Sequence, residues 1–180
     1  MQKKYELTDE TIIVEGRKLR RIRALIDFAD VAAGEYGGFV ESESNLSQGG
    51  DCWIFDDARA YGNAEVRDDA SLHDYACACG EAIISDRAQM YASAKASDSA
   101  CVSGKAVVTR AAHVFGNACI FDYALISNTA KVFDNARIYG FAQVRGNACV
   151  CGDARAYGFA QINGEAKISG HAEISDYTRC

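Results

Sequence analysis

Residues 130–147 have the sequence AKVFDN-ARIYGF-AQVRGN, in which one pattern of six residues occurs three times. Each unit begins with alanine, has an aliphatic residue two positions later, and has Asp or Gly two positions after that. The alanine recurs at every sixth position from Ala58 to Ala172, twenty times, with no insertion. An unbroken short period of this kind is typical of a solenoid, in which repeats stack on their neighbours.

The pattern inside each unit predicts a short strand and a corner. Apolar residues two positions apart, with polar residues between them, indicate a strand that buries one face. The Asp or Gly that follows predicts a turn, because these residues tolerate the backbone angles that a corner requires. One such strand cannot bury its inner face alone, whereas stacked parallel coils bury all of them. We therefore predict an all-β fold, a single-stranded parallel β-helix of hexapeptide repeats.

Aromatic residues indicate how many units form one coil. Two series recur once in every three hexapeptides: Phe121, Tyr139 and Tyr157, and Tyr123, Phe141, Phe159 and Tyr177. Because residues that stack should recur once per coil, we predict three units to a coil, which makes the coil triangular with three flat walls. The sequence from Val40 to Tyr177 has room for seven to eight coils. At about 4.8 Å between neighbouring strands, the prism would be about 35 Å long.

The first residues of the chain do not follow the repeat. Residues 11–14 and 19–28 are β-prone and are separated by Glu-Gly-Arg, which predicts a β-hairpin. An uncovered coil would expose strand edges and apolar core. We therefore predict an N-terminal β cap over residues 1–39, which covers the first coil of a β-helix over residues 40–180. Together they form one structural domain.

Composition limits the classes of function. A net charge of −6 argues against a nucleic-acid binder, because the phosphate backbone attracts basic surfaces. No stretch is apolar enough to span a bilayer, and the first residues lack the apolar region of a signal peptide. We expect a cytoplasmic protein with no nucleic-acid or membrane partner. Nothing in the sequence predicts a cofactor.

The residues before the first regular repeats resemble a known family. The segments GGFVE at 37–41, NLSQ at 45–48 and GDCWIFD at 50–56 are similar to the YdcK-like hexapeptide-repeat proteins of bacteria and phages. We also expect Gly34, Gly37 and Gly38 to mark a turn-rich passage. The resemblance implies a left-handed coil, a likeness to left-handed β-helix acyltransferases and a tendency to form homotrimers. It supplies no catalytic residues that could be transferred to this chain.

Three histidines are candidates for catalysis, and all lie at positions that face away from the core: His73, His113 and His171. Acyltransferases of the left-handed β-helix class use a histidine general base in a cleft between subunits, helped by a loop that leaves the coil. A general base must reach the proton it removes. His113 is the best placed, on a flat wall with Arg110 nearby. Because no loop interrupts the repeat around it, we favour surface histidines over catalysis.

Six of the eight cysteines form three pairs: Cys77 and Cys79, Cys149 and Cys151, and Cys101 and Cys119. The first two pairs point outward and lie four coils apart, about 19 Å by strand spacing, so they cannot share one ion. Structural zinc needs four converging ligands, and we predict no metal site. The third pair stacks on adjacent coils, where a disulfide is geometrically conceivable. Free thiols are expected in a cytoplasmic protein.

The two aromatic series are the feature with the clearest functional meaning. We expect their seven rings to project outward at one corner, as a stripe of roughly several hundred Å². Exposed apolar patches of that size mark interfaces, and a three-fold assembly would bury one such corner from each subunit. Self-stacking with partial exposure and a platform for a ligand or carbohydrate are the alternatives.

We therefore predict a non-catalytic β-solenoid scaffold or binding protein. We expect it to be homotrimeric, with room for a small ligand in clefts between subunits. Sequestration of a metabolite or signal, as in a phage protein, is one purpose that such clefts would allow. The alternative is an acyltransferase-like enzyme that uses His113 at a subunit boundary.

Overall fold

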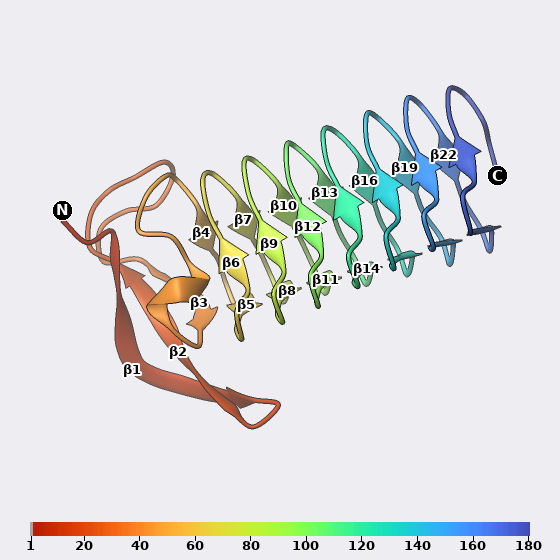
Figure 1. The fold of residues 1–180 in the computed structure, drawn as a ribbon. Helices are drawn as coiled ribbons and strands as arrows, with labels where there is room; N and C mark the ends of the chain where they lie inside the picture. Colours follow the sequence, from red (N-terminus) through yellow and green to blue (C-terminus); the bar gives the residue numbers. More distant parts are fainter. Residues whose placement is uncertain (1) are drawn as a thin grey trace.

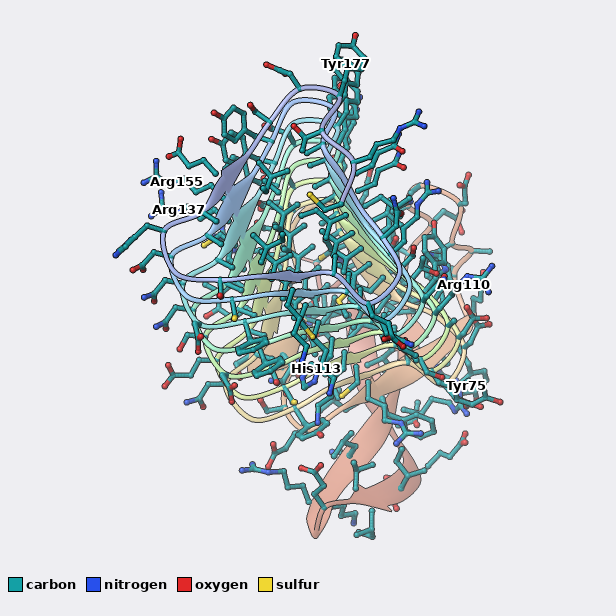
Figure 2. The ribbon with its side chains drawn as sticks, turned by 90° about the vertical axis from the view of Figure 1, so that its right-hand side faces the viewer. Tyr75, Arg110, His113, Arg137, Arg155 and Tyr177 are labelled. Atoms are coloured by element: carbon teal, nitrogen blue, oxygen red, sulfur yellow. The ribbon has the colours of Figure 1, made fainter. Side chains whose placement is uncertain are left out.

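The structure, a computed structural model, describes residues 2–180 as a three-sided parallel β-solenoid with an antiparallel hairpin at its N-terminal end (Figure 1). Each hexapeptide contributes one strand of two residues, and successive strands fall on successive walls. The view along the axis in Figure 2 shows three walls that meet at three corners. This is the hexapeptide-repeat β-helix that the sequence predicts.

We name the three walls A, B and C. Wall A contains β5 (Arg59–Ala60), β8 (Cys77–Ala78), β11 (Lys95–Ala96), β14 (His113–Val114), β17 (Lys131–Val132), β20 (Cys149–Val150) and β23 (Lys167–Ile168). Wall B contains β4 (Trp53–Ile54), β7 (Ser71–Leu72), β10 (Gln89–Met90), β13 (Val107–Val108), β16 (Leu125–Ile126), β19 (Gln143–Val144) and β22 (Gln161–Ile162). Wall C contains β6 (Glu65–Val66), β9 (Ile83–Ile84), β12 (Cys101–Val102), β15 (Cys119–Ile120), β18 (Arg137–Ile138), β21 (Arg155–Ala156) and β24 (Glu173–Ile174).

The pairing register confirms that three units form one coil. On wall C, for example, Cys101 pairs in parallel register with Cys119, its equivalent three hexapeptides later. The seven strands of walls B and C give seven regular coils, in agreement with the predicted seven to eight. The alanine column is fully buried from Ala58 to Ala160. Ala166 and Ala172, in the last coil, are partly exposed because no further coil covers them in the structure.

The corner residue of each unit has a positive φ, as Asp134 (φ 58) and Gly140 (φ 68) show. Where the corner residue is Asp and another coil follows, its carboxylate accepts the backbone N–H of the corner residue one coil later. Asp98 accepts from Gly116, and Asp134 accepts from Gly152, at 3.0 Å in both cases. Glycine relieves the strain of this conformation, whereas Asp tolerates it and adds a bond between coils. This explains why both residues occur at the same position.

The predicted hairpin is present, formed by β1 (Tyr5–Val14) and β2 (Arg17–Ala24). Its two turn residues, Glu15 and Gly16, have φ values of 50° and 78°, as a two-residue hairpin turn requires. Strand β2 pairs with β3 (Tyr36–Val40), and β3 pairs in parallel with β5. The cap is therefore continuous with wall A.

The cap covers more than the first coil, which the sequence did not indicate. The hairpin extends beside the outer face of wall A (Figure 1). There Leu19 and Phe39 form a second apolar cluster with Tyr61 and Cys79, residues of two successive coils. The outer face of wall A is therefore covered at its N-terminal end and open further along.

Of the three glycines expected in a turn-rich passage, Gly34 lies in a turn with φ 91, whereas the expectation is wrong for Gly37 and Gly38, which lie inside β3. A Cβ atom on Gly37 would lie 2.5 Å from the carbonyl oxygen of Ile54, and one on Gly38 would lie 2.3 Å from that of Ala58. These glycines allow the strand to cross the first coil at close range, which is a packing requirement and not a turn.

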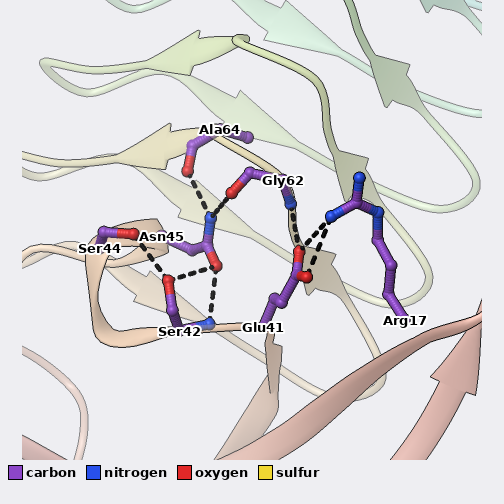
Figure 3. A network of polar contacts seen from close by, with 7 residues as sticks. All are labelled: Arg17, Glu41, Ser42, Ser44, Asn45, Gly62 and Ala64. Carbon is purple, nitrogen blue, oxygen red and sulfur yellow. Dashed lines mark hydrogen bonds and ion pairs between the residues drawn. The ribbon is translucent and has the colours of Figure 1, made fainter.

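A polar network joins the hairpin tip to the first coil (Figure 3). Arg17 donates to both carboxylate oxygens of Glu41 at 3.0 Å, and Glu41 accepts the N–H of Gly62 at 2.7 Å. Asn45, the last residue of the 3-10 helix η1 (Glu43–Asn45), is fully buried and donates to the carbonyl oxygens of Gly62 and Ala64. These side chains replace the strand ladder where the first coil is irregular.

No helix within residues 2–180 has the length and apolar character needed to cross a membrane.

Candidate functional site

The second aromatic series forms one column along the corner between walls C and B. The ring centroids of Tyr123 and Phe141 are 4.9 Å apart, those of Phe141 and Phe159 are 5.2 Å apart, and those of Phe159 and Tyr177 are 5.5 Å apart. The planes differ by 15° or less. The first three rings are 50%, 49% and 47% exposed, and Tyr177 is 79% exposed. We call these four residues the aromatic corner.

The first aromatic series lies beside this corner, at the adjoining edge of wall C. Phe121 stacks on Tyr139 at 4.9 Å, and Tyr139 stacks on Tyr157 at 5.2 Å. These three rings are half-buried. The predicted in-register stacking of both series is therefore present, and the exposed area is concentrated in the aromatic corner.

The orientation of the rings limits what the aromatic corner can bind. Phe141 and Phe159 each have another ring against both faces, so they present their edges to solvent. The face of Tyr123 that points away from Phe141 is occupied by the ammonium group of Lys105, 5.2 Å from the ring centroid. The column is suited to packing edge-on against another apolar surface. It offers few free ring faces on which a sugar could stack.

His113, the histidine that the sequence favours, lies on the outer face of wall A. It is flanked by Lys95 and Lys131 on the neighbouring strands, and its Nε2 is 2.9 Å from Oγ of Ser97. Burial, together with these two lysines, lowers the pKa of His113, so its imidazole is neutral near pH 7. Arg110 lies at the corner between walls B and A, and Figure 2 shows it apart from His113. His171 is exposed in the last coil.

The structure does not bring His113 and the aromatic corner together. Figure 2 shows His113 on one wall and Tyr177 at the opposite corner. A single site on one chain therefore cannot use both.

A groove beside His73 is the feature that the sequence reasoning missed. Residues of the loop between β2 and β3 face the outer side of wall B and enclose a cavity of about 390 Å³. Its polar lining consists of Asp30, Asp51, Asp69, Ser71, His73, Arg87 and Gln89. The prediction of surface histidines considered only loops that interrupt the repeat, whereas this loop belongs to the cap.

His73 is held in this groove by stacking. Its ring lies 4.5 Å from that of Phe55 and 4.6 Å from that of Tyr91, and its Nε2 is 2.9 Å from Oγ of Ser71. Burial lowers the pKa of His73 despite the opposing effect of nearby aspartates, so this imidazole is also neutral near pH 7. Phe55, His73 and Tyr91 recur once per coil, so the period that identifies the other aromatic columns would also have identified this one.

The cysteines are all free thiols, including Cys101 and Cys119 on adjacent strands of wall C. Within residues 2–180 no group of three or more His, Cys, Asp or Glu side chains is arranged to hold a metal ion. The Cys-x-Cys pairs were expected to point outward from the coil; Cys79, although on the outer side of wall A, is only 7% exposed because the hairpin covers it.

Comparison with known proteins agrees with this fold. No protein-family model matches the chain. A protein of Escherichia coli (strain K12) named "Uncharacterized acetyltransferase YdcK" is 41% identical over 73 residues. The match covers 36% of this chain and 22% of that protein, so the chain spans well under two thirds of the relative's length. Together with the solenoid architecture, this similarity confirms the predicted resemblance of the chain to the YdcK-like hexapeptide-repeat proteins.

Proposed function

We propose that this chain is a non-catalytic scaffold or binding protein that assembles as a homotrimer through its aromatic corner. The observation that carries the proposal is the column of four exposed rings in register along one edge of a rigid prism. A monomeric soluble protein seldom leaves a continuous apolar strip of this kind in contact with water.

The surroundings of the aromatic corner support packing against identical copies. On one side lies the half-buried series of Phe121, Tyr139 and Tyr157. On the other side Val107 and Leu125 point outward from neighbouring strands of wall B. If three parallel prisms meet at a three-fold axis, each aromatic corner contacts two others, and both flanks are covered as well. The ring edges then pack against apolar side chains, which matches the orientation of the stacked rings.

Oligomeric state tests this proposal. Light scattering coupled to size-exclusion chromatography should give three times the 19.4 kDa mass of one chain. The double variant Phe141→Ser/Phe159→Ser should shift to the monomer mass and keep the circular dichroism spectrum of the parent. Tyr75→Ser is the matched control, because Tyr75 is 59% exposed but lies at another corner, outside both series. A double variant that remains trimeric would show that the interface lies elsewhere.

A role in binding follows from the same assembly. Clefts between three prisms could hold a small molecule, and sequestration of a metabolite is one use of such clefts. Mass spectrometry of small molecules retained by the purified trimer, and lost from the monomeric double variant, would identify the ligand. If the trimer retains nothing, a pure scaffold is favoured.

A second candidate function, acyl transfer, is supported by the acetyltransferase name of the E. coli relative. Two neutral histidines, His113 and His73, have the protonation state of a general base. Transfer from an acyl thioester to a panel of amines and alcohols should be measured for the parent, His113→Gln and His73→Gln. Activity that neither substitution lowers would argue against histidine-dependent acyl transfer.

A further inference from the structure

Cys77 and Cys79 occupy an unusual position on the outer face of wall A. Cys77 lies in β8 (Cys77–Ala78) and Cys79 follows the strand directly, so both side chains point to the same side, because residues two apart in an extended segment share a face. The hairpin covers this part of the wall, and Cys79 packs in the cluster with Leu19, Phe39 and Tyr61. The pair therefore lies between the strand and the cap and not on an open surface.

Cys79 also borders a cavity of about 420 Å³ at the hairpin tip. The lining residues are Glu15, Arg17, Tyr61, Gly62, Asn63, Cys79, Gly80 and Glu81. Arg17 is fixed there by its two bonds to Glu41 (Figure 3). A small polar molecule can reach the cavity without displacing the hairpin, so burial in the cluster does not isolate this thiol.

The groups around the pair favour one thiolate. Lys95 pairs in register with Cys77 on the next strand of wall A. Hydrogen bonding with Cys77 lowers the pKa of Cys79, and the Tyr61 hydroxyl and Lys95 add to this effect against the opposing effect of burial. The same hydrogen bond, with burial, raises the pKa of Cys77. Cys79 is therefore the thiol that both borders the cavity and has the lowered pKa.

We propose that Cys79 and Cys77 form a hydroperoxide-reactive dithiol site, in which Cys79 is oxidised first and Cys77 resolves the product. The Cys79 thiolate attacks the terminal oxygen of a hydroperoxide, ROOH. An S–O bond forms, the O–O bond breaks, and ROH leaves after it takes up one proton. The Cys77 sulfur then attacks the sulfenic acid at Cys79. An S–S bond forms and the S–O bond breaks, and the hydroxyl leaves as water with the proton of the Cys77 thiol.

The final disulfide requires a local movement of the backbone, because the side chains of residues two apart in an extended segment are nearly parallel, and this makes the bond reversible. Cα atoms two residues apart in a strand are separated by about 6.6 Å, near the upper end of the range for disulfides. A bond at that limit is strained and is readily reduced by cellular thiols. The site therefore forms a labile disulfide and not a structural one.

The chain contains its own matched control. Cys149 and Cys151 have the same spacing on the same wall, Cys149 in β20 (Cys149–Val150) and Cys151 directly after it, and Lys131 and Lys167 flank Cys149 in register. This second pair lacks the hairpin and the tyrosine hydroxyl, and burial and Asp134 raise the pKa of Cys151. A difference in reactivity between the two pairs isolates the contribution of the covered cavity.

The test uses the full chain and limiting hydrogen peroxide, followed by alkylation, trypsin digestion and mass spectrometry. Trypsin separates the pairs, because residues 68–87 contain only Cys77 and Cys79, and residues 146–155 contain only Cys149 and Cys151. We expect the 68–87 peptide to form its disulfide at least about tenfold faster, in line with a larger thiolate fraction. Equal rates for the two peptides would overturn the proposal, since spacing alone would then explain the oxidation.

Three variants assign the roles of the residues. Cys77→Ser should accumulate a sulfenic acid at Cys79 that dimedone labels, whereas Cys79→Ser should leave Cys77 unlabelled. Tyr61→Phe keeps the packing and removes the hydroxyl, and it should slow oxidation towards the rate of the control pair. Dimedone labelling of Cys77 in Cys79→Ser would reverse the assignment. Circular dichroism of each variant establishes that the fold is intact.

Discussion

Replacement of Asp134 by alanine tests the explanation of the corners. Asp134 has φ 58, and its carboxylate accepts the N–H of Gly152 at 3.0 Å. Loss of a hydrogen bond at an exposed site costs about 1 kcal/mol. Alanine in the left-handed region costs about 1 kcal/mol more than Asp, whose short polar side chain tolerates this conformation. We therefore expect Asp134→Ala to lower the free energy of unfolding by about 2 kcal/mol.

Two further variants at this position separate the two contributions. Asp134→Asn keeps an acceptor oxygen and should remain within about 0.5 kcal/mol of the parent. Asp134→Gly loses the bond but removes the strain, so its cost should fall between the other two at about 1 kcal/mol or less. The assay is urea unfolding followed by circular dichroism, with midpoints compared at equal slope. If Asn destabilises as much as Ala, the hydrogen bond between coils does not contribute in the way described here.

Three other predictions follow from the core, the cap and the histidines. Ala130→Leu should overpack the closed core and cost about 1–3 kcal/mol, whereas Ala166→Leu in the partly open last coil should cost less in the same urea assay. Gly38→Ala would place a Cβ atom 2.3 Å from a carbonyl oxygen, so we expect the amides of the cap to lose protection in hydrogen exchange while those of the later coils keep it. Burial lowers the folded-state pKa of His73 and His113, so the unfolded chain binds protons more readily and stability should fall as pH drops below about 6.5. Replacement of both histidines by Gln should flatten the dependence of the urea midpoint on pH, and an unchanged slope would contradict this account.

The periodic part of the molecule was predictable in detail because each coil contacts only its neighbours. A contact between neighbouring coils joins residues three hexapeptides apart, so the spacing of Tyr123, Phe141 and Phe159 already specifies their stacking. The same rule specifies the buried alanines. Because these contacts have one fixed separation along the chain, a single period in the sequence encodes them all.

The contacts of the cap have no such period, and only the tertiary structure shows them. Leu19 lies in one cluster with Cys79, which is distant in the sequence, because the hairpin is directed along wall A. The loop near His73 lies against wall B for a similar reason. Sequence determined the solenoid, its three walls and its aromatic columns through local repetition. The cap does not repeat, and its course depends on packing against a surface that exists only after the coils have stacked. That course determined which cysteine is covered and which histidine lies in a groove.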